Sequence, residues 1–214
     1  VPAAATFDII ILAVKPQQLV EITPAVASRF GSTALYISIA AGKTLAQLES
    51  LLGQAAIIRA MPNMPAMIGA GATALVANTH TTPHQRNMGH ALFDAVGRSV
   101  WLTDESLMDT VTAISGSGPA YFFQFMACMV EAAVKHGLPP ETAATLVLQT
   151  AKGAAILAAQ SQHGLCDLTA QVTSKGGTTE AALAVFDHND ALKTLVNDAV
   201  TAAISRAKQL NEMA

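Results

Sequence analysis

The chain has 214 residues, of which 51% are hydrophobic and only 13% are charged, and this composition excludes an intrinsically disordered protein. Its net charge of −3, without any lysine or arginine cluster, argues against nucleic acid or an anionic membrane as a partner. No apolar stretch has the uninterrupted length of a membrane span. The low share of charged residues predicts that a subunit interface covers part of the surface.

In the first half of the chain, short β-rich runs alternate with helical patterns. The runs are continuously apolar, as in strands that are buried on both faces. Between them, Pro16 and Thr44 each begin a helix, and a third helix is expected from Pro83 to about Val96. This alternation predicts an α/β layer with a mostly parallel sheet. The expected strands are Asp8–Val14, Ala34–Ala40, Ala56–Met61, about Ala72–Ala77 and Ser99–Leu102.

The second half contains no β-rich run, and we expect it to be all helical, with the domain boundary near Thr103. Asp104 caps its first helix, which is interrupted at Gly118. The helices carry alanine on several sides, which permits close packing and favours dimerisation. The further helices are expected to end at Gly137, to run from Pro140 to about Gln160, and to lie near Thr179–Phe186 and Asp190–Glu212.

Three turns that follow successive strands have a shared composition. AVKPQ (residues 13–17) contains a proline and SIAAG (38–42) consists mainly of small residues. RAMPNMPAMIGAGAT (59–73) has two prolines and two glycines, with Asn63 as a polar group. Because doubly wound sheets bind ligands at the carboxyl ends of their strands, the three turns together indicate a nucleotide crevice. The phosphate-binding pattern G-x-G-x-x-G is absent from these residues. Either the cofactor domain is incomplete here or no dinucleotide binds.

The stretch SKGGTTEAAL, residues 174–183, places two glycines and two threonines ahead of an apolar helix. A helix N-terminus offers unpaired N–H groups and a partial positive charge, which suit an anion. The alternative is a flexible loop with a threonine N-cap. On the residues alone, both interpretations stay open.

Cysteine and histidine usage bears on the compartment and on metals. Cys128 and Cys166 have no CxxC spacing, and with no visible signal peptide they indicate a reducing cytoplasm. The six histidines lack paired ligand spacing, so we assign no metal. The sequence opens at Val1, close to a core-like strand, and we therefore expect a fragment that lacks the N-terminal part of its first domain.

Taken together, the motifs resemble the pyrroline-5-carboxylate reductase family from Asp8 onward. The matching segments, in chain order, are LAVKPQ (12–17), AAG (40–42), MPNMPA (61–66), LMDTVTAISGSGPAY (107–121), GLP (137–139) and QVTSKGGTT (171–179). The resemblance implies reduction of the C=N bond of 1-pyrroline-5-carboxylate to L-proline with NADPH or NADH, the last step of proline biosynthesis. It implies a partial Rossmann-type domain over residues 1–103. It also implies a helical domain for substrate binding and dimerisation over residues 104–214, in a homodimer or higher homo-oligomer.

The resemblance also assigns roles to residues. The expected cofactor contacts are Ala13, Val14, Lys15, Pro16, Ala40 and Ala41, to which the third turn adds Asn63. The expected substrate contacts are Glu105, Gln171, Ser174, Gly176, Gly177, Thr178 and Thr179. Of these, Thr179 is expected to hydrogen-bond the ring nitrogen, and Glu105 to stabilise positive charge there.

The sequence departs from the family pattern at three places. Lys175 stands where the family has proline, and Met64 where threonine is common. The first βαβ unit of the family, with its glycine fingerprint, has no counterpart in these residues. Two further hypotheses therefore accompany the reductase: a helical dimerisation module with a vestigial nucleotide domain, and a related reductase of another imine or keto acid.

Overall fold

A computed structural model describes residues 7–213, and the chain divides into two compact units. Residues 1–119 together with 200–214 form the first, the sheet unit, and residues 120–199 form the second, the helical unit. The boundary expected near Thr103 lies inside the sheet unit, because the segment that follows it packs on the sheet. Met108, for example, is only 1% exposed and belongs to the sheet unit's core.

The sheet has five strands in the order β1-β2-β3-β4-β5, so each strand pairs with its neighbour in sequence. β1, β2 and β3 are parallel, β4 runs antiparallel to β3, and β5 is parallel to β4. The mostly parallel sheet that the alternating pattern predicts is therefore confirmed. The strands are β1 Ile9–Leu12, β2 Leu35–Ser38, β3 Ala56–Met61, β4 Gly71–Ala77 and β5 Gly97–Trp101.

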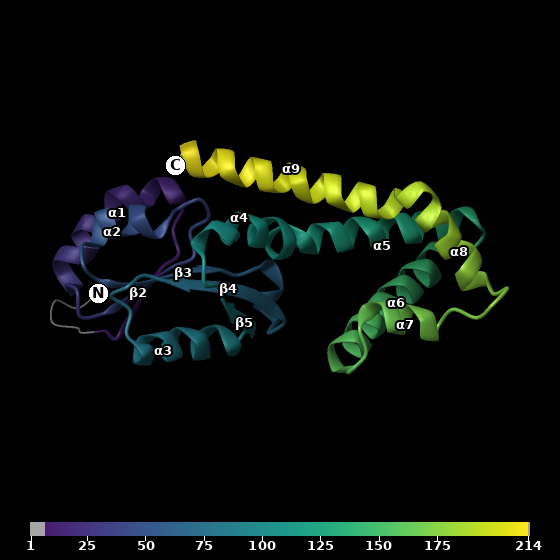
Figure 1. The fold of residues 1–214 in the computed structure, drawn as a ribbon, viewed down its shortest axis with the longest axis horizontal. Coiled ribbons are helices and arrows are strands. Elements are labelled where there is room, and N and C mark those ends of the chain that lie inside the picture. The colour runs from purple at the N-terminus through teal and green to yellow at the C-terminus, as the bar shows by residue number, and fades with distance from the viewer. Residues whose placement is uncertain (1–6, 214) are drawn as a thin grey trace. The chain divides into compact units, whose positions relative to one another are not determined.

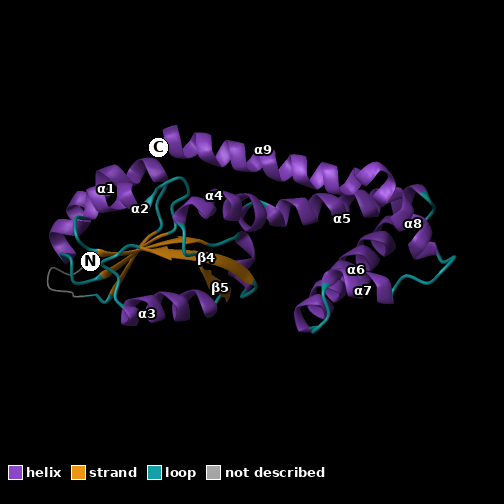
Figure 2. Ribbon diagram, viewed as in Figure 1, coloured by secondary structure: helices purple, strands orange, loops and turns teal. Residues whose placement is uncertain are grey.

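Helices cover both faces of this sheet (Figure 2). α1 (Pro16–Phe30) and α2 (Leu45–Leu52) pack on one face, where Leu19 and Leu48 bury against Tyr36 of β2. α3 (Pro83–Asp94) covers the other face. There Phe93 belongs to a second apolar cluster, together with alternate residues of the strands. The helix starts expected at Pro16, Thr44 and Pro83 are confirmed, and Thr44 Oγ1 accepts a hydrogen bond from Gln47 N at 3.2 Å.

Two regions of the chain depart from the expected pattern. The turn after β3 contains a 3₁₀ helix, η1 (Met64–Ile68). The single helix expected from Asp104 is divided into η2 (Glu105–Leu107), α4 (Met108–Val111) and a π-helical turn, η3 (Thr112–Gly116), before α5 (Gly118–Lys135) begins. Asp104 does cap the segment, since its carboxylate accepts from Ser106 N at 2.8 Å.

The helical unit contains most of α5, then α6 (Pro140–Gln160), α7 (Leu165–Gln171), α8 (Thr178–Asp187), η4 (His188–Asp190) and the first part of α9 (Ala191–Met213) (Figure 1). α7 was not predicted, because seven residues are too few for a clear helical period. The other helices begin and end close to the expected residues.

The helical unit buries little of its own apolar surface. Among its described residues only Ala143 and Val147 are buried, whereas Phe122, Phe123 and Phe125 are exposed. α6 is long and apolar enough to span a membrane by length and composition alone, with a mean hydropathy of 1.3, although it contains Lys152. Such a surface is suited to contact with a second protein chain.

Candidate functional site

Two of the expected cofactor turns lie side by side at the edge of the sheet that is formed by the carboxyl ends of β1 and β2. β1 and β2 are parallel neighbours, so the turn that follows β1 (residues 13–16) and the turn that follows β2 (residues 40–42) meet there. Ile39 N donates to Leu12 O at 3.2 Å and ties the two strand ends together. Ala13, Lys15 and Ala41 are exposed, and Ala40 is buried beneath them. The structure thus brings these predicted residues together.

Local geometry explains how these turns form. Pro16 is the first residue of α1, where its missing N–H costs nothing, and Gln18 N donates to Lys15 O at 2.9 Å. Gly42 has a φ of 76°, a left-handed conformation that glycine adopts without strain. The turn after β2 can therefore reverse sharply and leave its backbone close to the sheet edge.

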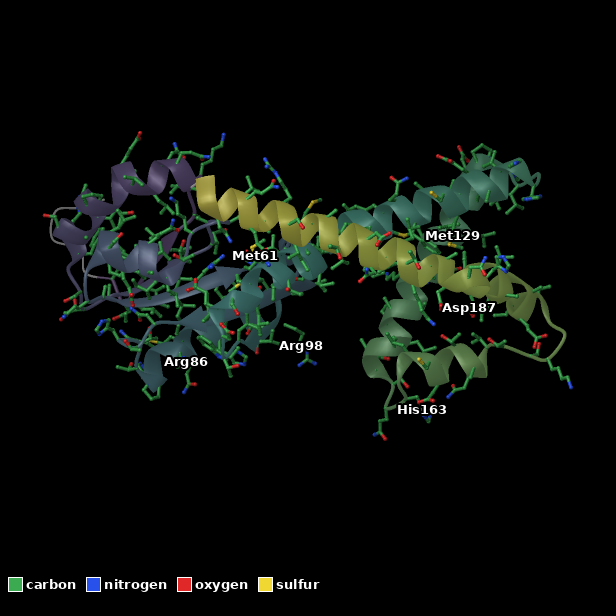
Figure 3. The ribbon with its side chains drawn as sticks, turned by 45° about the horizontal axis from the view of Figure 1, so that its top comes forward. Met61, Arg86, Arg98, Met129, His163 and Asp187 are labelled. Carbon is green, nitrogen blue, oxygen red and sulfur yellow. The ribbon has the colours of Figure 1, made fainter. Side chains whose placement is uncertain are left out.

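Asn63 lies at the end of β3 and ties three elements together. Its Nδ2 donates to Ser115 O of the π-helical turn at 3.0 Å, and its Oδ1 accepts from Ala72 N of β4 at 2.9 Å. Nearby, a Cβ added to Gly116 would lie 2.8 Å from Cε of Met61, which Figure 3 labels. Asn63 therefore holds the third turn in place, and its contact with a cofactor stays a prediction.

Like Asn63, Glu105 connects elements that are far apart in the sequence. Its Oε1 accepts from Arg59 Nη1 at 2.7 Å and from Leu45 N, the first residue of α2, at 2.8 Å. The side chains of Arg59 and Glu105 are 6% and 26% exposed, so the carboxylate neutralises a buried guanidinium. Next to it, two hydrogen bonds from Ser106 hold the pKa of the Asp104 carboxyl below its usual value. The residues alone predict Glu105 at the start of its own helix, and its partners in β3 and α2 are not visible from local sequence.

The expected substrate loop lies in the helical unit. Gln171 ends α7, and Gly177 N donates to Ser174 O at 2.9 Å to close a turn before α8. The N-cap is Gly177, not a threonine, and Thr178 and Thr179 are the first two helical residues. Gly176 has a φ of 73°, so a left-handed backbone precedes the helix. A Cβ on Gly177 would lie 2.9 Å from Ser174 O, which explains the second glycine.

This loop already binds a carboxylate oxygen. Gly176 N donates to Oε2 of Glu180 at 2.7 Å. The N–H groups of Thr178 and Thr179 lie in the first turn of α8, where no helical carbonyl is available to them. The Thr178 side chain is exposed and that of Thr179 is half-buried. Lys175 is exposed as well, and nothing in the structure explains why it stands in place of proline.

The predicted site residues therefore fall into two groups. Ala13–Pro16, Ala40, Ala41, Asn63 and Glu105 belong to the sheet unit, and Gln171–Thr179 to the helical unit. In the described part of the chain, no group of three or more His, Cys, Asp or Glu side chains is arranged to hold a metal ion.

Residues that sequence reasoning missed lie close to the cofactor turns. A cavity of about 140 Å³ at this edge is lined by Pro16, Ala41 and Gly42, and also by Asp109, Leu210 and Asn211. Asn211 Nδ2 donates to Asp109 Oδ1 at 2.7 Å. No local pattern connects two residues so far apart in the chain, although Asp109 lies inside a segment that matches the family.

Comparison with known proteins agrees with this architecture. Residues 105–210 match a family model described as pyrroline-5-carboxylate reductase dimerisation. The chain is 44% identical to the pyrroline-5-carboxylate reductase of Pseudomonas aeruginosa over 98% of its own length and 77% of that protein. It is 40% identical to the Haemophilus influenzae enzyme over 100% of its own length and 79% of that protein.

Two solved structures show the same relationship. The pyrroline-5-carboxylate reductase of Coxiella burnetii superposes with a TM-score of 0.91 at 41% identity, over 95% of this chain and 76% of that one. The Plasmodium falciparum pyrroline carboxylate reductase, solved with NADP bound, has a TM-score of 0.84 at 32% identity, over 95% of this chain and 77% of that one. The identity over nearly the whole chain and the shared fold place this chain in the pyrroline-5-carboxylate reductase family.

Proposed function

We propose that this protein reduces the C=N bond of 1-pyrroline-5-carboxylate to L-proline with NADPH or NADH, the last step of proline biosynthesis. The observation that carries the proposal is the loop at residues 174–179, whose Gly176 N–H already binds a carboxylate oxygen. A chain of this family thus presents, ahead of a helix N-terminus, a backbone that suits the carboxylate of a small imino acid.

The turns at the sheet edge fit a dinucleotide. The small side chains of Ala13, Ala40 and Ala41 leave room for close approach of the cofactor, and Val14, Lys15 and Pro16 complete the first turn. When bound, the reduced nicotinamide supplies the hydride, so the protein needs no covalent step of its own. The P. falciparum relative, solved with NADP, supports the choice of a nicotinamide cofactor.

The substrate loop orients the imine and holds its charge. We assign the carboxylate to the N–H groups of Gly176, Thr178 and Thr179, where the left-handed Gly176 gives it access. Thr179 Oγ1 hydrogen-bonds the ring nitrogen and so favours the protonated, more electrophilic imine. Glu105 can stabilise positive charge on the substrate only through Oε2, because Arg59 and Leu45 already donate hydrogen bonds to its Oε1.

A homodimer or larger homo-oligomer is part of the proposal. The match to a dimerisation model over residues 105–210 supports it, as do the exposed apolar side chains of α5 and α6. A partner subunit, and not a membrane, is then the cover for α6. The two cysteines, Cys128 and Cys166, are free and exposed, which is consistent with a cytoplasmic location.

The test is a paired assay on the protein in the full length that its gene encodes. It measures 1-pyrroline-5-carboxylate reduction with NADPH or NADH, and proline-dependent reduction of NADP⁺ or NAD⁺ at high pH. We expect Thr179→Ala to lower kcat/KM by about 5- to 100-fold, equivalent to about 1–3 kcal/mol, because it removes a polar partner from the site. Thr142→Ala, an exposed position of α6, serves as the matched control.

Each alternative has its own outcome in this assay. A non-catalytic dimerisation module would form dimers and show no activity with any imine. A reductase of another imine or keto acid would show a much higher kcat/KM for that compound than for 1-pyrroline-5-carboxylate. An unchanged kcat/KM in Thr179→Ala would remove Thr179 from the mechanism.

A further inference from the structure

The small cavity at the sheet edge lies wholly within the sheet unit. Its volume of about 140 Å³ is close to that of an engineered cavity of about 150 Å³ that holds one benzene ring. It has room for a single six-membered ring and not for a whole nucleotide. Pro16 and Ala41, two of the expected cofactor contacts, line it.

The residues that line the cavity distinguish the pyrroline ring of the substrate from the nicotinamide ring of the cofactor. Asp109 supplies a carboxylate, and neither lysine nor arginine is among the lining residues. The pyrroline substrate carries a carboxylate, which Asp109 would repel. The nicotinamide ring is neutral when reduced and positively charged when oxidised, so it is the ring that this lining accepts.

The end of α9 closes the cavity. Figures 1 and 3 show the C-terminal end of this helix beside α1, and Leu210 and Asn211 line the cavity from that side. Asn211 Nδ2 donates to Asp109 Oδ1 at 2.7 Å. A Cβ on Gly42 would lie 3.4 Å from Asn211 Oδ1 and 3.6 Å from Leu210 O, so the helix end packs directly on the turn after β2.

We infer that the last turns of α9 close the nicotinamide end of the cofactor site, and that Asn211 is a positioning residue that holds Asp109 against the ring. The inference rests on the proposed function and adds a segment, residues 207–211, that lies outside the turns and the substrate loop. A fixed Asp109 carboxylate would stabilise the positive charge that distinguishes the oxidised ring from the reduced one.

The experiment measures binding without turnover. Dissociation constants are determined by calorimetry for NADPH, NADP⁺, reduced nicotinamide mononucleotide, and 2′-phospho-ADP-ribose, which lacks the nicotinamide. The variants are Asn211→Ala, Asn211→Asp, Asp109→Asn and the exchange Asp109→Asn with Asn211→Asp. Ser205→Ala, an exposed position on the same helix, is the control.

We expect Asn211→Ala to weaken binding of NADPH and of reduced nicotinamide mononucleotide about tenfold, the size of one lost hydrogen bond to a charged group. Asn211→Asp should weaken it further, because two carboxylates then face each other. The exchange should restore most of the affinity for the two reduced compounds, since an amide again donates to a carboxylate, but not the affinity for NADP⁺, since residue 109 then has no carboxylate. Asp109→Asn should weaken NADP⁺ more than NADPH.

The fragment without nicotinamide separates a local effect from loss of the fold. Its affinity should be the same in every variant. Wild-type affinity for NADPH and reduced nicotinamide mononucleotide in Asn211→Asp would overturn the inference and leave the proposed function intact. Absence of NADPH binding in the wild-type protein would overturn the proposed function itself, and this inference with it.

Discussion

Glu105 shows how one carboxylate serves a buried cation and a helix end together. Its Oε1 receives both Arg59 Nη1 and Leu45 N. The Arg59 guanidinium sits on β3, almost fully removed from water. A charge in such a place is tolerated because a paired acceptor lies beside it. At the scale of the residue, the contacts of Glu105 give it a structural role, and its part in catalysis stays a prediction.

We predict that Glu105→Gln lowers the free energy of unfolding by about 3 kcal/mol, since it leaves the Arg59 charge buried without an anion. Urea denaturation measures the change. Glu141→Gln, an exposed position in the first turn of α6, should cost far less and serves as the control. Equal effects of the two substitutions would show that the ion pair contributes nothing beyond surface charge.

Glu180 competes for the same backbone donor that we assign to the substrate. Its carboxylate occupies the Gly176 N–H at 2.7 Å. We predict that Glu180→Gln lowers the KM for 1-pyrroline-5-carboxylate about threefold, because a neutral amide oxygen is a weaker acceptor than a carboxylate. Steady-state kinetics measure it, with Asp187→Asn at the other end of α8 as the control. A raised KM would instead mean that Glu180 shapes the loop for the substrate.

At the scale of the element, much of the sheet follows from its sequence. β1, β2 and β3 are continuously apolar because helices cover both faces, and this signal is strong. The antiparallel direction of β4 was not predicted, although the chain contains the reason. Residues 62–70 are too few for a crossover between parallel strands, which needs a dozen or more residues. Connection length, more than composition, sets this strand's direction.

The π-helical turn η3 could not be predicted from local pattern. Residues 105–117 have a sequence that favours one continuous helix, yet Ser117 N bonds Thr112 O, five residues back. A residue far away in sequence binds at this π-helical turn, since Asn63 Nδ2 donates to the Ser115 carbonyl at 3.0 Å. A still larger separation in sequence hides the hydrogen bond between Asn211 and Asp109 from local analysis. The turns that follow β1 and β2 could be placed from the sequence, whereas the long-range hydrogen bonds of Asn63, Glu105 and Asp109 could not.

We predict that Asn63→Ala lowers the free energy of unfolding by about 1–2 kcal/mol, because it removes the side-chain partners of Ser115 O and Ala72 N. Amide hydrogen exchange gives the sharper test. The Ala72 amide should exchange faster in Asn63→Ala but keep its protection in Asn63→Asp, which retains an acceptor oxygen. Equal exchange of the Ala72 amide in both variants would show that Asn63 does not stabilise β4.

At the scale of the whole molecule, the low charge of the sequence and the exposed apolar helices have one explanation. The helical unit has almost no core of its own among its described residues, and Phe122 of α5 is 71% exposed. A single chain would leave this surface in water. Two chains can bury it together, which is consistent with the match of residues 105–210 to a dimerisation model.

We predict that light scattering of the wild-type protein finds a dimer or a larger assembly and no monomer, and that Phe122→Asp produces monomers. Burial of one phenylalanine contributes about 1.5–3 kcal/mol, and a twofold interface contains the residue twice, so the loss is at least about 3 kcal/mol, or more than a hundredfold in the dissociation constant. Glu131→Gln, which is exposed on the same helix, should leave the assembly intact. A monomeric wild type would contradict the interface, because the apolar faces of α5 and α6 would then have no cover.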